Sequence, residues 1–206
     1  MANSHTLIIK PEDYSKVSNH WEHFDTITDP RLIATFNVTD TSNPTSIMDS
    51  SAISLFDKIW IDDVEQQSVV SSYTFDTIGE HTVKYSLVDS TTIGTGIFYN
   101  KTNLISIVIP NTVTTINQVA FARCTNLTNI TIGSGVTTIG QNIFDTCSSL
   151  ESITCLATTA PTIESNTFQN VNTNGTLYVP TNSDYSTWMD TGDYYLGKYS
   201  WTKVEQ

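Results

Sequence analysis

A motif that recurs every 23 residues constrains the fold of this chain more than any other feature of its sequence. Each unit holds five positions of fixed spacing that are apolar in the first three units. Steps of 23, 23 and 24 residues relate four such units, and in the last unit Asn174 takes the third position. Five positions that recur together across three steps predict a repeat architecture. Unit by unit, the matching apolar residues are Ile93, Phe98, Leu104, Ile107, Ile109; Ile116, Phe121, Leu127, Ile130, Ile132; Ile139, Phe144, Leu150, Ile153, Cys155; and Ile163, Phe168, Leu177, Val179.

The spacing within a unit predicts how one coil is built. Ile130 and Ile132 flank a polar Thr131, and this alternation is typical of a strand with one face buried. The spacing of Ile116, Phe121 and Cys124 favours a short helical or 3₁₀ turn on the opposite wall. No unit can bury its apolar face alone, so units must stack about 4.7–4.9 Å apart. The sequence predicts a mainly β protein in which residues 90–180 form a solenoid of four units that needs caps.

Charge divides the chain near residue 90. The whole chain has 206 residues, with nine Lys and Arg against 21 Asp and Glu. Residues 1–89 carry 14 acids and five bases, whereas residues 90–180 carry three acids and two bases and are rich in Thr and Asn. Such an acidic chain has no electrostatic reason to bind nucleic acid or an anionic membrane. The sequence lacks an apolar run of 18 residues, so we expect no membrane insertion.

Residues 31–89 contain several short runs that alternate like strands. In the run from His81 to Leu87, polar Thr82 and Lys84 alternate with apolar neighbours, and Gly79 supplies a turn before it. Short strands of this kind predict a small Ig-like β-sandwich that covers the first repeat. The other strand-like runs span residues 32–38, 59–61 and 69–75.

Residues 1–30 form an expected N-terminal arm. Pro11 followed by Glu12 and Asp13 favours a helix start, with acids at the positive end of the helix dipole. This arm could anchor the protein to a partner, or it could pack on the neighbouring sandwich. Its candidate apolar face consists of Tyr14, Val17, Trp21 and Phe24.

The C-terminal segment, residues 181–206, is dense in aromatic residues, with six of them within 17 positions. One interpretation is an aromatic cap that covers the open end of the last coil. The other is a contact surface for a partner protein or a glycan, because Tyr and Trp offer large area at low entropic cost. The candidate contact residues are Tyr185, Trp188, Tyr194, Tyr195 and Trp201, and Tyr199 lies among them.

The sequence offers no persuasive catalytic, cofactor-binding or metal-binding set, so we expect a non-enzymatic protein without a cofactor. His20, Glu22 and His23 could place two imidazoles one helical turn apart, but a metal site usually needs three or four ligands. Cys124 and Cys147 lie one repeat apart and should stack in one ladder. Burial as small hydrophobic residues is the default for them, and a disulfide between adjacent coils is the alternative.

The repeat segments resemble a known family. The stretches IPNTVTTINQVAFARCTNLTNITIGSGVTTIGQNIFDTCSSLESITC and ATTAPTIESNTFQNVNTNGTLYVP are similar to BspA-like leucine-rich repeats of bacterial and phage surface proteins. The resemblance covers about residues 90–180, and the upstream YTFDTIGEHTVKYSLVD looks like the small sandwich that often precedes such repeats. The resemblance implies a repeat fold and a surface role, and it does not identify a ligand.

Two functions are expected from these features. The first is a structural component of a phage virion, a capsid decoration or fibre-associated protein, which the lack of a recognisable signal peptide favours. Its partners would be proteins of a larger assembly, and a homo-oligomer is left open. The second is a secreted bacterial cell-surface adhesin or glycan-binding module that contacts a host-surface protein or glycan. The virion surface is the expected location in the first case, and the bacterial surface in the second.

Overall fold

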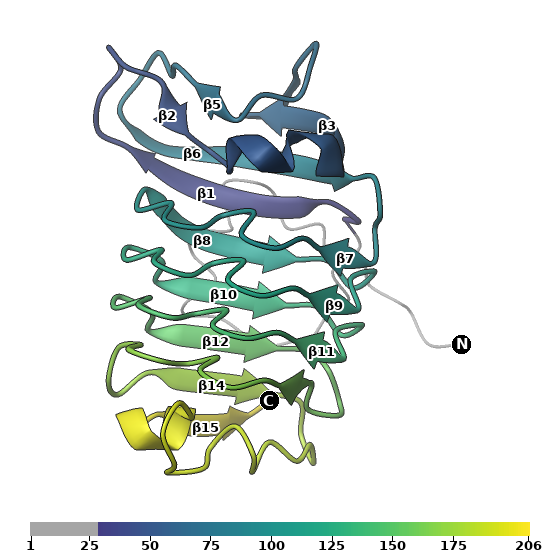
Figure 1. Ribbon diagram of the computed structural model, residues 1–206, viewed down its shortest axis with the longest axis vertical. Coiled ribbons are helices and arrows are strands. Elements are labelled where there is room, and N and C mark those ends of the chain that lie inside the picture. Colours follow the sequence, from purple (N-terminus) through teal and green to yellow (C-terminus); the bar gives the residue numbers. More distant parts are fainter. Residues whose placement is uncertain (1–28) are drawn as a thin grey trace.

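The computed structural model describes residues 29–206 as three sheets, of which one runs the length of the molecule (Figure 1). This long sheet has nine strands in the order β15-β14-β12-β10-β8-β1-β6-β3-β4. A second sheet has the order β13-β11-β9-β7, and a third pairs β2 with β5. The strands of the long sheet are β1 Leu32–Val38, β3 Phe56–Ile61, β4 Val64–Glu65, β6 Gly79–Leu87, β8 Leu104–Ile109, β10 Asn129–Ile132, β12 Ser152–Cys155, β14 Thr176–Val179 and β15 Thr202–Glu205.

The repeats form a β-solenoid in which each coil supplies one long and one short strand. The long strands are parallel, and Ile130 of β10 lies in register with Ile107 of β8 and Ile153 of β12. This is the register that the 23-residue period predicts, so the predicted solenoid is confirmed. The short strands are β7 Thr92–Ile93, β9 Thr115–Ile116, β11 Thr138–Ile139 and β13 Thr162–Ile163, and they are also parallel.

The C-terminal segment adds a fifth turn to the solenoid. Strand β15 pairs in parallel with β14, so that Lys203 lies beside Leu177 and Glu205 beside Val179. A 3₁₀ helix, η3 (Leu196–Tyr199), precedes this strand. The sequence predicted a cap here but not a further strand, because β15 carries charged residues where the other coils carry apolar ones.

A column of stacked aromatic rings runs through the core of the solenoid. The ring centroids of Phe98 and Phe121 lie 5.7 Å apart, those of Phe121 and Phe144 6.0 Å, and those of Phe144 and Phe168 5.7 Å. Neighbouring planes differ by only 10–11°, and all four side chains are fully buried. Because each ring touches the equivalent ring of the next coil, the column links the coils along the whole solenoid.

The wall opposite the long strands consists of turns rather than the predicted helical or 3₁₀ segments. Each coil turns at two left-handed residues four positions apart, such as Val119 with Arg123. Asn tolerates this backbone conformation better than most residues, which gives a physical reason for part of the Asn enrichment of the repeats. The corresponding pairs in the other coils are Gly96 with Asn100, Asn142 with Thr146, and Asn166 with Asn170.

Residues 29–89 continue the long sheet, and the expected Ig-like sandwich is not confirmed. Strand β1 pairs antiparallel with β8 on one side and with β6 on the other. The inner face of this part is covered by η2 (Ser50–Leu55) and by the pair β2 (Thr45–Ser46) and β5 (Ser72–Tyr73). Alternation located β1, β3 and β6, whereas the predicted run 69–75 contains only the two-residue β5, and β2 and β4 were not predicted. Alternation also does not reveal that β1 takes a repeat strand as its partner.

The two parts of the molecule share one core. Phe36 of β1 and Tyr85 of β6 are fully buried, and the ring of Tyr85 lies 5.5 Å from that of Phe98 in an edge-on arrangement. The hydroxyl of Tyr85 donates a hydrogen bond of 2.7 Å to the carbonyl of Ile47. The N-terminal strands therefore close the first end of the solenoid, as a cap must.

Candidate binding surfaces

Three of the five aromatic residues predicted to contact a partner belong to the core. Tyr185 and Trp188 are 0% exposed and Trp201 is 5% exposed. The ring of Trp188 lies 5.4 Å from that of Phe168 and so extends the phenylalanine column into the fifth turn. These residues form the cap, which was one of the two interpretations of the segment.

The polar atoms of these three side chains are also used inside the protein. The Tyr185 hydroxyl donates to the carbonyl of Ala157 at 2.7 Å, and the indole N–H of Trp188 donates to that of Pro161 at 2.9 Å. The indole N–H of Trp201 donates to the carbonyl of Asn172 at 2.7 Å. Burial raises the pKa of Tyr185 well above its ordinary value. The side chains offer a ligand neither a ring face nor a donor.

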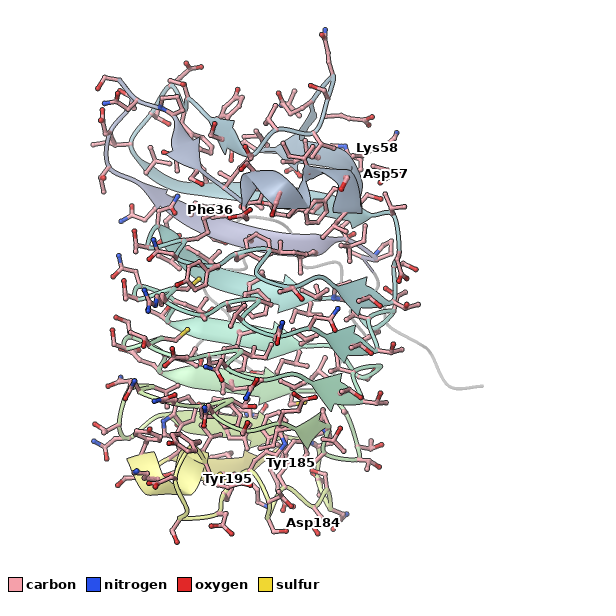
Figure 2. All side chains as sticks on the ribbon, viewed as in Figure 1. Phe36, Asp57, Lys58, Asp184, Tyr185 and Tyr195 are labelled. Carbon is pink, nitrogen blue, oxygen red and sulfur yellow. The ribbon has the colours of Figure 1, made fainter. Side chains whose placement is uncertain are left out.

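Tyr194 and Tyr195 remain accessible at the C-terminal end of the solenoid. Tyr194 is 37% exposed and Tyr195 is half-buried. Figure 2 labels Tyr195, Tyr185 and Asp184, and all three belong to this end of the molecule. An exposed ion pair between Lys198 and Asp193 lies in the same segment. Of the predicted contact residues, these two tyrosines are the ones that a partner or glycan can reach.

A polar hollow of about 300 Å³ lies at the seam between the N-terminal strands and the first repeat. Two segments enclose it, residues 39–46, which end in β2, and the loop of residues 100–103, and Pro44 is the only apolar residue in its lining. The carbonyl of Asn103 accepts a hydrogen bond of 2.8 Å from the backbone N–H of Asn37, so β1 and the first repeat hold the two loops together. The lining residues are Asn37, Thr39, Asp40, Asn43, Pro44, Thr45, Ser46, Asn100, Lys101, Thr102 and Asn103.

The single acid of this hollow is already engaged. The carboxylate of Asp40 accepts hydrogen bonds from the side chain of Asn43 at 2.7 Å and from the hydroxyl and backbone N–H of Ser42. These bonds lower the pKa of Asp40 to about 2. The amides of Asn37 and Asn100 also line the hollow. Amide and hydroxyl groups dominate the rest of the lining, which also holds the cation Lys101, and such groups suit a polar ligand rich in hydrogen-bonding groups.

Threonine side chains form a regular wall along the short strands. The hydroxyl of Thr114 donates to the carbonyl of Thr91 at 3.2 Å, that of Thr137 to Thr114 at 3.3 Å, and that of Thr162 to Thr137 at 3.2 Å. All four residues are exposed. The hydroxyl protons of Thr114, Thr137 and Thr162 are thus used between coils, whereas that of Thr91 is donated to the carboxylate of Asp89. The three later threonines present methyl groups and oxygen lone pairs without charge.

The outer face of the long sheet, which is the face opposite the core, carries an apolar patch where β1 meets β8. Residues at one outer register position are Val108, Thr131, Thr154 and Tyr178 in successive coils, with Ile33 of β1 beside Val108. Ile105 also lies on this side, next to the irregularity in the β1–β8 pairing. Sequence reasoning missed this patch, although Val108 in place of threonine was a visible departure from the repeat.

Cysteine and histidine side chains serve the fold in the described residues. All three cysteines are free and buried, and the thiol of Cys147 donates to the carbonyl of Phe121 at 3.2 Å. Burial raises the pKa of Cys124 to about 12. The expectation of buried cysteines is confirmed, and the alternative of a disulfide is wrong. His81 contacts Asp62 at 2.7 Å.

Within residues 29–206 there is no group of three His, Cys, Asp or Glu side chains that could hold a metal ion. The same part of the chain contains no helix long and apolar enough to cross a membrane. The candidate arm residues Tyr14, Val17, Trp21 and Phe24 lie outside the described residues, as do His20, Glu22 and His23.

Comparison with known families supports the resemblance of the repeats. Residues 91–188, just under half of the chain, match the BspA type leucine rich repeat region in six copies. The match reaches Trp188, in agreement with the place of that residue in the aromatic column. No curated protein and no solved structure matches the chain. A repeat region of this type indicates a surface or interaction protein.

Proposed function

We propose that this chain is a non-enzymatic structural or interaction protein displayed on a surface, and more specifically a phage virion component, either a capsid decoration or a fibre-associated protein. The observation that carries the proposal is the division of its side chains between core and surface. The large aromatic residues form one continuous buried column, and the solenoid walls present uncharged threonine and asparagine groups.

This division suits a stiff display element. Stacked coils that share a sheet and an aromatic column resist bending, because every coil touches its neighbours along its whole length. The wall of Thr114 and Thr137 carries no charge, so it attracts neither nucleic acid nor an anionic membrane. A partner would bind this wall by shape and hydrogen bonds. The partners are proteins of a larger assembly.

The test is to ask which particle contains the protein. An antibody against the repeats is used on purified phage particles and on washed cell envelopes from the same culture, with a capsid protein and an envelope protein as markers. The proposal expects the protein to sediment with the particles at a fixed ratio to the capsid protein. Its absence from the particles and presence in the envelopes would contradict the virion assignment.

The polar hollow favours a second candidate, a secreted or cell-surface adhesin that binds glycans. Its amides and hydroxyls match the hydrogen-bonding groups of a neutral saccharide, and Tyr194 and Tyr195 offer ring surface at the other end of the molecule. Binding is measured by glycan array and calorimetry. The adhesin assignment expects Asn37→Ala with Asn100→Gly, which keeps the left-handed turn at residue 100 accessible, to weaken binding at least tenfold, while Asn117→Ala, outside the hollow, leaves it unchanged. Failure of every saccharide to bind would exclude a role for this hollow.

A further inference from the structure

Part of the outer face of the long sheet is more deeply buried than a free sheet face. Ile33 keeps 2% of its surface exposed, Thr154 5%, Lys84 7% and Thr35 8%. The strand pairings place all four on the face opposite the core, because their neighbours along each strand face inward. By comparison, Ile53 and Val88, which are apolar residues outside this face, are 37% and 66% exposed.

The elements that cover the long sheet among the described residues pack on its inner face. Residues of η2, β2 and β5 pack with the inward residues of the sheet, and Figure 1 shows η2 in front of β6. The coil walls and the short strands enclose the same inner core. Among residues 29–206, side chains of the sheet and its adjoining loops meet on the outer face. The guanidinium of Arg31 lies 4.8 Å from the ring of Trp60, and Lys84 pairs with Asp63.

We propose that the outer face of the long sheet, from β6 to β12, is the docking site of residues 12–24 of the same chain. In this arrangement Tyr14, Val17, Trp21 and Phe24 form the apolar side of a helix. That side packs on the patch of Ile33, Ile105 and Val108.

The position of the segment supports this occupant. The chain enters β1 at Leu32, next to Ile33, so the segment that precedes Asp29 is connected to the sheet beside the apolar patch. The five residues from Phe24 to Asp29 reach at most about 17 Å when extended. The patch lies within this reach of β1, whereas the far end of the solenoid does not.

The lengths also agree. A helix of 13 residues is about 20 Å long at about 1.5 Å per residue. The buried outer residues extend from Lys84 on β6 through Ile33 on β1 to Thr154 on β12. The distance between β6 and β12 in the sheet is four strand spacings. At about 4.8 Å per spacing this distance is about 19 Å. One helix laid across the strands would therefore cover the buried outer residues.

This inference is independent of what the molecule binds. It assigns the outer sheet face to the protein's own arm, which leaves the threonine wall, the polar hollow and the rings of Tyr194 and Tyr195 as the surfaces free for partners. The alternatives are an arm that docks on a second copy and an arm that stays undocked.

The experiment uses the full chain with two introduced cysteines and a short bis-maleimide. Val17→Cys with Val108→Cys places one thiol on the arm and one on the patch, and Val17→Cys with Thr137→Cys is the matched control on the threonine wall. The native thiols are buried and do not compete. We expect an intrachain cross-link in the first variant and none in the second. A cross-linked dimer, equal cross-linking of both variants, or none in either would overturn the proposal.

A second measurement covers the case in which the double variant does not fold. In the single variant Val108→Cys, labelling of the thiol should be at least tenfold slower than in Thr137→Cys. Replacing Trp21 and Phe24 by alanine should remove this protection while labelling of Thr137→Cys stays the same. Labelling of Val108→Cys as fast as that of Thr137→Cys in the intact chain would overturn the proposal.

Discussion

Lys203 and Glu205 form an ion pair, with Nζ 2.9 Å from Oε1, at the two register positions of β15 that hold apolar side chains in the preceding coils. Their neighbours on β14, Leu177 and Val179, are fully buried. Charges at core-facing positions of an edge strand prevent a further strand from stacking, because stacking would remove them from water. The pair therefore ends the solenoid.

Replacing Lys203 by Ile and Glu205 by Val should restore the apolar pattern and allow end-to-end association. The expected result is a concentration-dependent dimer or larger species, measured by light scattering coupled to size exclusion. The control Thr114→Val with Thr137→Val adds apolar surface to a side wall and should stay at the size of the unmodified protein. Equal behaviour of both variants would show that the ion pair does not protect the edge.

The aromatic column predicts a large effect of a single truncation. Phe121→Ala removes a fully buried ring that stacks on two others, so it should lower the free energy of unfolding by about 3–5 kcal/mol. Denaturant unfolding followed by circular dichroism measures this change. Tyr194→Ala, at an exposed ring, should change it by less than about 0.5 kcal/mol. A loss below about 1 kcal/mol for Phe121→Ala would contradict the column.

The turn at Val119 is expected to be a weak point. Val119 is β-branched and adopts φ 52°, a left-handed conformation that costs about 1–2 kcal/mol for most residues. The equivalent residue two coils later is Asn166, with φ 61°. Val119→Asn should therefore raise the free energy of unfolding by roughly 1 kcal/mol, and Asn166→Val should lower it by a similar amount. Thermal and denaturant unfolding measure both changes in the free energy of unfolding. A change of the same sign in both variants would contradict the prediction that the left-handed turn favours Asn over Val.

Cys124 should make the protein less stable in alkali. Burial raises its pKa from an ordinary value of 9.0 to about 12, so the unfolded state loses its thiol proton at a lower pH than the folded state. This contribution is complete below about pH 9 and is lost as the pH rises toward 12. At pH 10.5 the loss is about 2 kcal/mol for this thiol. In Cys124→Ala the free energy of unfolding should decline less steeply between pH 8 and 10.5 than in the unmodified protein. An unchanged slope would contradict the raised pKa of Cys124.

The repeat fold followed from the sequence because equivalent residues lie beside one another. Once Ile130 is equivalent to Ile107, stacking sets both the register and the contents of the core. The fifth turn could not be found this way, since Lys203 and Glu205 replace the residues that define the pattern. The pairing of β1 with β8 could not be found either, because it joins a non-repeat strand to a repeat strand in antiparallel orientation.

The candidate surfaces were harder to predict than the core. Nothing in the sequence distinguishes Tyr185 and Trp201, which are buried, from Tyr194, which is exposed. The path of the last turn decides which of these side chains are covered. The polar hollow arises where two loops distant in sequence meet, and neither loop carries a motif. The density of aromatic residues predicted the cap, but only the burial seen in the structure distinguishes the aromatic residues of the cap from the accessible ones.

The antiparallel junction between β1 and β8 gives folding a direction. Strand β1 is the first to be synthesised among the described strands, yet both of its partners, β6 and β8, follow later in the chain. Its pairing closes long loops, which is slow, whereas each later coil adds by contacts between adjacent repeats. A nucleus that forms around β1 would therefore be followed by coil-by-coil propagation toward β15, in the same order in which the ribosome releases the chain.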